Sequence, residues 1–251
     1  MVDYRNFRFH KLGTPEFSHL KLLLFWPIYG VAFFLLERGL PWILDLFGKQ
    51  ITYYPVWCPL DDVIPFCELF IIPYYFWFAF LAGMLLYSLL FEVPTFRKYM
   101  WFIIWTYSIT CVIYAVFPNM QELRPEVEEI GRQNFLVDIA FFLYNFDTNT
   151  NVFPSLHVIG SFAVFFAAWH SERFSTWWWR LIFGVCAVLI SISTVFLRQH
   201  SILDVVGGLV VCFAVYPFVF LRKPKGHKGK KSDADSGTEP KPQEEPEEIT
   251  V

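Results

Sequence analysis

Hydrophobic residues form long runs along this chain, and short polar segments separate the runs. Several runs approach the roughly 20 residues that a helix needs to cross the hydrocarbon core of a bilayer. We predict six membrane-spanning helices, at about 22–44, 68–91, 99–117, 155–171, 177–198 and 202–221. A polar loop at 118–134 and a short apolar segment at 135–145 precede the fourth span. The short segment cannot cross a bilayer, so we expect an interfacial or re-entrant helix there.

The composition supports this interpretation. Hydrophobic residues make up 55% of the 251 positions and charged residues 17%, whereas a typical soluble domain is about 25% charged. A soluble fold of this length could not bury so much apolar surface. We therefore predict an all-α polytopic membrane protein, a bundle of six transmembrane helices with a short interfacial segment before the fourth.

The charges along the chain predict its boundaries and its orientation. Residues 1–21 are polar and basic, and 222–251 begin with Lys and Arg before becoming rich in Pro and Glu. We expect a cytoplasmic segment at 1–21, a transmembrane domain at 22–221 and a disordered cytoplasmic tail at 222–251. The positive-inside rule places both termini in the cytoplasm and the loops at 45–67 and 118–154 on the other face.

The residues Pro154-Ser155-Leu156-His157 stand at the start of the fourth predicted helix. Ser155 is a favoured N-cap residue, and the free N–H groups at a helix start attract an anion. His157 would lie in the first turn, where a protonated imidazole can donate its proton to a leaving oxygen. This helix end is therefore a candidate anion site, with Ser155 as a ligand and His157 as the acid.

A second candidate group lies at the start of the sixth predicted helix. His200 and Asp204 are four residues apart, so the carboxylate can accept a hydrogen bond from the imidazole. Such a bond fixes the tautomer and leaves the other ring nitrogen as a nucleophile. A carboxylate within a membrane span is costly and is a functional candidate for that reason. The guanidinium of Arg124, in the loop before, suits phosphate oxygens.

Each feature also has a plain structural interpretation. A histidine at a helix end is usually a cap, a His–Asp pair is often structural, and Arg124 alone is compatible with a surface charge. The joint occurrence of His157, His200, Asp204 and an arginine at one predicted membrane face favours a functional site.

Together these residues resemble the type 2 phosphatidic acid phosphatase superfamily. Its signatures are Lys-x6-Arg-Pro, Pro-Ser-Gly-His and Ser-Arg-x5-His-x3-Asp. The matching positions are Arg124-Pro125, Pro154–His157, Ser193, His200 and Asp204. Phe117, Leu156 and Thr194 replace the expected Lys, Gly and Arg, so two phosphate-binding cations are missing. The Pro-Ser-Leu-His and Ser-Thr variants are similar to the branch that includes inositol phosphorylceramide synthases.

The resemblance implies a phosphohistidine mechanism without a metal or cofactor. His200 would attack phosphorus, Asp204 would orient His200, and His157 would protonate the leaving alkoxide. Arg124, Ser155 and Arg198 would hold the phosphoryl oxygens; Arg198 lies one turn beyond Thr194 if that helix continues. We expect an integral membrane lipid phosphatase that hydrolyses a phosphate ester of an amphiphilic lipid on the non-cytoplasmic face. Its partners would be the lipid phosphate substrate and membrane lipids, and no nucleic acid is expected.

Three alternatives remain open. An alcohol acceptor in place of water would make the same site a lipid phosphotransferase, as in inositol phosphorylceramide synthases. The missing cations also fit a catalytically degenerate membrane protein of the same fold. A His/Asp metal site is the third alternative, although the sequence lacks the HExxH motif of metalloproteases.

Overall fold

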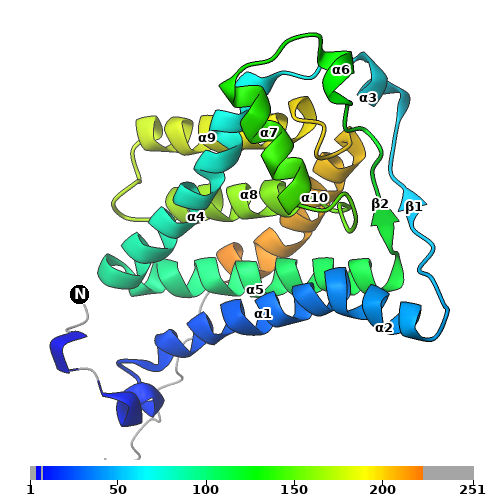
Figure 1. Cartoon of the computed structure of the whole chain (residues 1–251). Helices are drawn as coiled ribbons and strands as arrows, with labels where there is room; N and C mark the ends of the chain where they lie inside the picture. Colours follow the sequence, from blue (N-terminus) through cyan, green and yellow to red (C-terminus); the bar gives the residue numbers. More distant parts are fainter. Residues whose placement is uncertain (1–3, 7, 223–251) are drawn as a thin grey trace, which may run out of the picture.

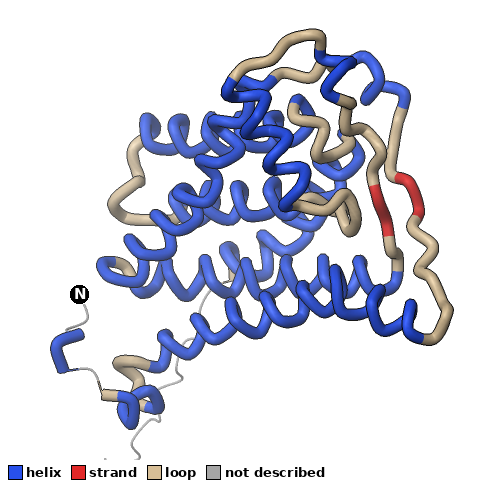
Figure 2. The backbone as a smooth tube through the Cα atoms, in the orientation of Figure 1, coloured by secondary structure: helices blue, strands red, loops and turns tan. Residues whose placement is uncertain are grey.

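The computed structural model describes residues 4–6 and 8–222, and nearly all of their regular structure is helical (Figures 1 and 2). The predicted disordered tail lies outside the described residues from position 223 onward. The elements that precede the second predicted span are η1 (Tyr4–Asn6), η2 (Phe9–Gly13), η3 (Ser18–Leu24), α1 (Phe25–Phe34), η4 (Leu35–Gly39), α2 (Leu40–Leu46), β1 (Tyr54–Pro55) and α3 (Pro59–Val63).

The remaining elements build the bundle and the loops at one of its ends (Figure 1). They are η5 (Glu68–Phe70), α4 (Ile71–Phe91), α5 (Val93–Val116), β2 (Asn119–Met120), α6 (Val127–Ile130), α7 (Phe135–Phe146), α8 (Leu156–Trp169), α9 (Trp177–Phe196), α10 (Ile202–Tyr216) and η6 (Pro217–Leu221).

Five helical stretches of the described chain are long and apolar enough to cross a membrane. They are Ser18–Leu46, Glu68–Phe91, Val93–Val116, Trp177–Phe196 and Ile202–Leu221. The fourth bundle helix in chain order, α8, has 14 residues and is roughly 21 Å long at 1.5 Å per residue. The predicted all-α membrane bundle, with its short fourth helix, is confirmed.

Helix α8 can be short because it lies at the centre of the bundle. It packs against α4, α5, α9 and α10 (Figure 1). Gly160, Ala163 and Ala167 are small and lie on its buried face, which lets the neighbouring backbones approach closely. Protein rather than lipid therefore surrounds this helix, and it does not need the length of a lipid-exposed span.

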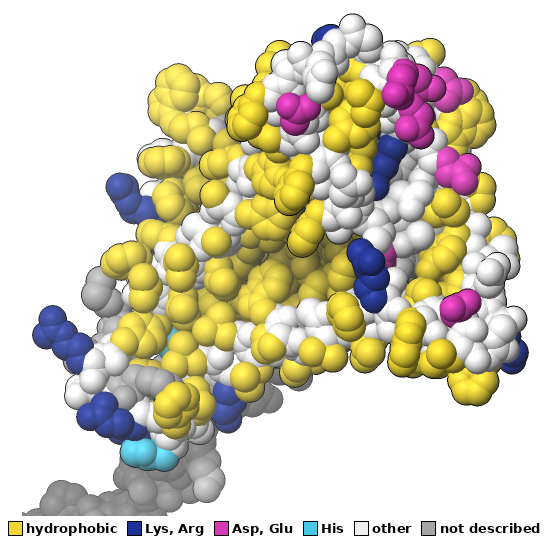
Figure 3. Space-filling view, viewed as in Figure 1, with side chains coloured by type: hydrophobic (Ala, Val, Ile, Leu, Met, Phe, Trp, Pro, Cys, Tyr) yellow, Lys and Arg dark blue, Asp and Glu magenta, His cyan; other side chains and the backbone are white. Residues whose placement is uncertain are grey.

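The outer helices present hydrophobic side chains outward. Large exposed apolar residues lie along α1, α4, α9 and α10, as expected for surfaces that face lipid tails. Figure 3 shows hydrophobic side chains over much of the visible face, with a hydrophobic hollow near its centre.

Several predicted boundaries differ from the structure by a few residues, and two of the differences have a local cause. Helix α5 begins at Val93 rather than near 99, because Pro94 in its first turn starts the helix earlier. Helix α9 ends at Phe196 rather than 198, because Arg198 adopts a left-handed conformation with φ of 53°. The segment predicted at 135–145 is α7, which begins after the N-cap Asn134.

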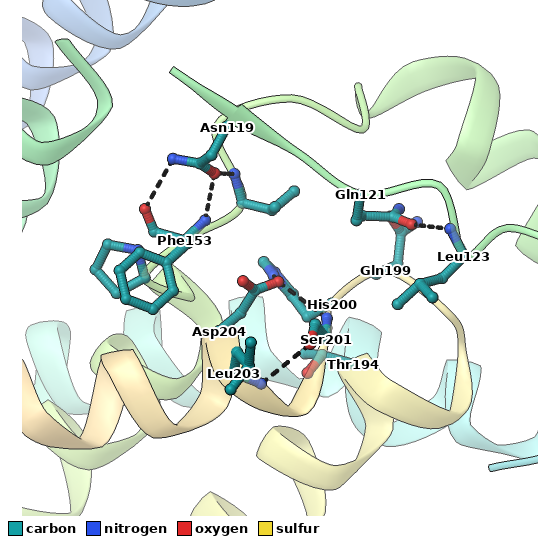
Figure 4. Close-up of polar contacts among 12 residues, drawn as sticks. Asn119, Gln121, Leu123, Phe153, Thr194, Gln199, His200, Ser201, Leu203 and Asp204 are labelled. Carbon is teal, nitrogen blue, oxygen red and sulfur yellow. Dashed lines mark hydrogen bonds and ion pairs between the residues drawn. The ribbon is translucent and has the colours of Figure 1, made fainter. Parts of the chain in front are cut away.

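The loop before α8 is held by side chains from α5 and β2. The Oδ1 atom of Asn119 accepts hydrogen bonds from the backbone N–H groups of Val152 and Phe153, each at 2.8 Å (Figure 4). The Tyr114 hydroxyl donates to the Pro154 carbonyl at 2.9 Å. These bonds set the position from which α8 begins.

The first span is attached to the same loop. Glu37, in the π-helical turn η4, accepts hydrogen bonds from the hydroxyls of Thr148 and Thr150 and from the side-chain amide of Asn151. A carboxylate in the middle of a membrane helix thus has three donors from the loop that leads to α8.

Gly207 of α10 gives the helix packing a direct test. A Cβ atom at this position would lie 2.4 Å from the Phe153 ring, whereas one at Gly83 of α4 would meet nothing within 4 Å. We expect Gly207→Ala to displace Phe153 and to destabilise the protein by about 1–3 kcal/mol, a typical overpacking cost. Thermal unfolding in detergent measures the change. Gly83→Ala is the matched control and should be neutral or stabilising.

Candidate active site

His200 and Asp204 meet in the turn between α9 and α10. The Nδ1 atom of His200 lies 3.1 Å from the Oδ2 atom of Asp204 (Figure 4). The same oxygen accepts a hydrogen bond from the Ser201 backbone N–H at 2.9 Å. Because Nδ1 faces the carboxylate, Nε2 is the ring nitrogen of His200 that is left for chemistry.

His157 approaches His200 from α8. The centroids of the two imidazole rings are 5.7 Å apart, and the ring planes are inclined at 65°. On its other side the His157 ring packs against Tyr74 and Trp77 of α4, with centroid distances of 4.4 and 4.5 Å. The two histidines, 43 positions apart in the sequence (200 minus 157), therefore share one site.

Ser155 lies at the N-cap of α8, as the sequence predicts. Its backbone N–H donates to the Asp204 carbonyl at 3.1 Å. Its side chain is fully buried, and the Oγ atom has no hydrogen-bond partner among the described residues. The hydroxyl is therefore available to a ligand at the helix end, where the first N–H groups also lack intrahelical acceptors.

Asp61 holds the beginning of α10 in place. Its side chain accepts hydrogen bonds from the Ser201 hydroxyl at 2.6 Å, from the Ile202 N–H at 2.9 Å and from the Cys58 N–H at 2.8 Å. Asp61 is 1% exposed, and a buried carboxylate near a helix N-terminus is stabilised by these N–H groups. It fixes the helix that carries Asp204.

Arg124 lies beside the site but bonds mainly to the protein. Its Nη1 atom donates to the carbonyls of Tyr144 and Asp147 at 2.9 and 3.0 Å. Its Nη2 atom donates to the Thr148 carbonyl at 2.9 Å and to Gln199 Oε1 at 2.7 Å. Nε is buried without a partner among the described residues. Only the Nε–H group of the guanidinium therefore remains for a ligand, because the Nη1 and Nη2 atoms are bonded to the protein.

Arg198 does not extend α9, so the expected helical spacing from Thr194 is wrong. The residue lies in the turn, and its Nη1 atom donates to the Asp61 carbonyl at 2.7 Å. Thr194, which replaces the arginine of the family's third signature, donates its hydroxyl to the Ser191 carbonyl. Arg198 is partly exposed and lines a polar cavity together with Arg124.

Arg132, a second arginine of the loop at 118–134, is engaged in an ion pair. Its Nε and Nη2 atoms donate to the Glu68 carboxylate at 2.9 and 2.5 Å. This pair joins the start of α7 to the start of α4. Phe117, in place of the family's first-signature lysine, stacks on Tyr54 with a centroid distance of 5.4 Å.

Asp147 is a second acidic residue at the site that the sequence patterns did not single out. Its Oδ2 atom accepts a hydrogen bond from Tyr74, whose ring contacts His157. Burial raises the pKa of the Asp147 carboxyl, while the charges of His200 and then Arg124 act in the opposite direction. The polar run 147–151, which Val152 and Phe153 separate from Pro154, was the signal that could have indicated this residue.

Among the described residues, no group of three or more His, Cys, Asp and Glu side chains is arranged to hold a metal ion. The acid–base groups of the site are His157, His200 and Asp204, and the neighbouring hydrogen-bond donors are Ser155, Arg124 and Gln199.

The fold and the site define a polytopic membrane protein with a His–His–Asp centre. A family model described as the PAP2 superfamily matches residues 118–227, which include all three centre residues. This match confirms the resemblance to the type 2 phosphatidic acid phosphatase superfamily that the sequence motifs indicated. It also supports a phosphatase-type function. Neither the comparison with curated proteins nor that with solved structures gave a match.

The raised pKa of Asp147 predicts how pH affects stability. The folded protein binds this proton more tightly than the unfolded chain, so stability is lost as pH rises from the ordinary Asp value, about 3.9, through the raised one. We expect Asp147→Asn to remove this loss. The variant's unfolding temperature should exceed the parent's near neutral pH, and the difference should vanish in acid.

Thermal unfolding in detergent across this pH range measures the effect. Asp45→Asn changes an exposed carboxyl of α2 and serves as the control. A constant difference between Asp147→Asn and the parent at every pH would contradict the prediction.

Proposed function

We propose that this protein is an integral membrane lipid phosphatase that hydrolyses a phosphate ester of an amphiphilic lipid through a phosphohistidine. The observation that carries the proposal is the pairing of the two imidazoles, with ring centroids 5.7 Å apart, while Asp204 binds Nδ1 of His200. A nucleophile oriented by a carboxylate, next to a second acid–base group, is the arrangement that covalent phosphoryl transfer needs.

The proposed reaction has two steps. The Nε2 atom of His200 forms a bond to phosphorus, the P–O bond to the lipid alcohol breaks, and the leaving oxygen takes a proton from His157. Water then attacks phosphorus, His157 accepts a proton from that water, and the N–P bond breaks to release phosphate. Ser155, Arg124 and Arg198 would stabilise the phosphoryl oxygens, and such electrostatic stabilisation supplies much of the acceleration in phosphoryl transfer.

An amphiphilic substrate fits the surroundings of the site. An apolar groove of about 650 Å³ lies beside Pro154, the residue before Ser155. Its walls come from α5, α10 and the loop after β1, and include Trp57, Ile113, Phe117, Phe153, Val206 and Val210. A hydrocarbon chain in this groove would leave its polar end near the start of α8.

We further propose that the site opens on the non-cytoplasmic face and that both termini are cytoplasmic. The support is the distribution of Lys and Arg, which is richer in the segments at the other end of the bundle. The partners of this reaction are then the lipid phosphate substrate and the surrounding membrane lipids, with no nucleic acid and no cofactor involved.

The roles of the three centre residues can be separated by substitution. We expect His200→Ala to abolish turnover and His157→Ala to lower it roughly 10²- to 10⁴-fold, since His157 supplies acid–base catalysis. Asp204→Asn should lower it by roughly 10³-fold or more, because the His200 tautomer is then wrong. Phosphate release from a lipid phosphate in detergent, with a chelator present, measures these effects.

His170 is the control, because it lies at the other end of α8 and bonds to the Phe166 carbonyl. His170→Gln should keep full turnover. A labelled phospholipid also identifies the acceptor: free phosphate indicates hydrolysis, and a new labelled lipid indicates transfer to an alcohol. Full activity in His200→Ala would exclude the phosphohistidine, and activity lost on chelation would favour a metal site.

Arg198 is the cation nearest in sequence to the nucleophile. We expect Arg198→Gln to lower turnover roughly 100-fold, the typical effect of removing one donor to a developing oxyanion. Arg173→Gln, which changes an exposed arginine before α9, should have no effect. Unchanged turnover in Arg198→Gln would remove this residue from the site.

A further inference from the structure

Several buried donors around His200 are not used by the protein. Gln199 is 2% exposed, and its Nε2 atom has no partner in the described part of the chain. The same holds for Arg124 Nε and Ser155 Oγ. More than nine in ten buried polar groups in proteins have a hydrogen-bond partner. A set of unpartnered donors beside a nucleophile therefore indicates a ligand that carries acceptor oxygens.

The orientation of the Gln199 amide is fixed. Its Oε1 atom accepts a hydrogen bond from Arg124 Nη2 at 2.7 Å, so the amide nitrogen is the atom left for a ligand. The backbone N–H groups of Gln199 and His200 both donate to the Thr194 carbonyl, at 2.9 and 3.1 Å. These bonds fix the backbone from which both side chains extend; Figure 4 shows Gln199 on the side of the turn that faces Gln121.

The donors of this site carry little positive charge. The two positions where the family places a further lysine and arginine hold Phe117 and Thr194. Phe117 packs on an aromatic ring and Thr194 bonds within its own helix. Arg124 uses four of its five N–H groups on the protein. A neutral amide therefore stands where a cation would otherwise help to bind phosphate.

Carboxylates lie close to the same site. Asp204 binds His200, Asp61 binds the turn that follows it, and Asp147 binds Tyr74 beneath His157. The guanidiniums of Arg124 and Arg198 donate to the main-chain carbonyls of Asp147 and Asp61, not to these carboxylates. A doubly charged phosphate monoester would meet more repulsion here than a singly charged diester, because charges interact strongly where water is excluded.

A polar cavity adjoins one of these donors, Arg124. It has a volume of about 520 Å³, and its charged lining residues are Arg124, Arg132, Arg198, Asp62, Glu122 and Glu129. A phosphate monoester carries nothing that would fill this space, whereas a diester carries a second substituent on phosphorus. The mixed charges of the cavity suit hydroxyl groups, which both donate and accept hydrogen bonds.

We propose that Gln199 is a specificity-determining residue, whose amide donates to a phosphoryl oxygen and selects a singly charged phosphodiester lipid with a hydroxyl-bearing head group. This inference rests on the proposed function. The Nε2 atom of His200 bonds to phosphorus as the P–O bond to the lipid alcohol breaks, and His157 protonates that oxygen. The head-group ester stays on phosphorus until water, deprotonated by His157, releases the head-group phosphate from His200.

The test compares two lipids with the same acyl chains. Phosphatidylglycerol is the diester probe and phosphatidic acid the monoester probe, and both yield diacylglycerol. We expect kcat/KM for phosphatidylglycerol to exceed that for phosphatidic acid at least about tenfold, from the charge of the two phosphates. A preference for phosphatidic acid would overturn the inference and leave the phosphatase proposal standing. No diacylglycerol from either lipid would overturn both.

The substitution Gln199→Glu tests the amide itself. It keeps the oxygen that binds Arg124, removes the free donor and adds a negative charge. We expect kcat/KM to fall about 10- to 100-fold for the diester, and further for the monoester, so that the preference for diester grows. Gln50→Glu, the same change at an exposed position after α2, is the control.

If Gln199 had a purely structural role, Gln199→Glu would lower kcat/KM for the diester and for the monoester by the same factor. Their ratio would then be unchanged, and that result would contradict the inference. Gln199→Met gives a second, uncharged variant in case the glutamate disturbs folding. It removes the donor without adding charge, so it should lower the activity on both lipids, and parental activity in this variant would overturn the role of the amide.

Discussion

The carboxylate of Asp204 is the group on which the rest of the site depends. One of its oxygens accepts from the His200 ring and from the Ser201 N–H, so the same atom orients the imidazole and caps the helix that follows. Helix and histidine are therefore positioned together. Asp61, which lies 140 positions before Ser201 in the sequence, reinforces this arrangement by accepting a hydrogen bond from the Ser201 hydroxyl. Donors satisfy both oxygens of Asp61 and the Oδ2 atom of Asp204, whereas the Oδ1 atom of Asp204 is buried without a partner among the described residues.

The central position of α8 serves the same purpose. Its first turn places His157 against Tyr74 and Trp77, and its small residues allow α4, α5, α9 and α10 to surround it. The loop before it is held by Asn119 and Tyr114. Packed helices thus support His157, which favours a reproducible distance between its ring and that of His200.

Much of the fold and the centre of the site could be predicted from sequence. Hydrophobic run lengths predicted the spans, and the spacing of His200 and Asp204 predicted their bond. The conformation of Arg198 could not be predicted, because a left-handed residue in a turn depends on the packing of both adjoining helices. The carbonyl partners of Arg124 and the role of Asp61 were also invisible, since they join segments that only the folded chain brings together.

The attachment of Glu37 to the loop at 148–151 has a consequence for the limits of the functional unit. The family model begins at residue 118, yet Glu37, Asp61, Tyr74 and Trp77 all precede it and all contact the catalytic segment or its supports. A fragment cut at the family boundary would retain both histidines and lose the contacts that hold them. The matched region therefore carries the candidate site residues, while several of the side chains that hold them in place come from the first 117 positions.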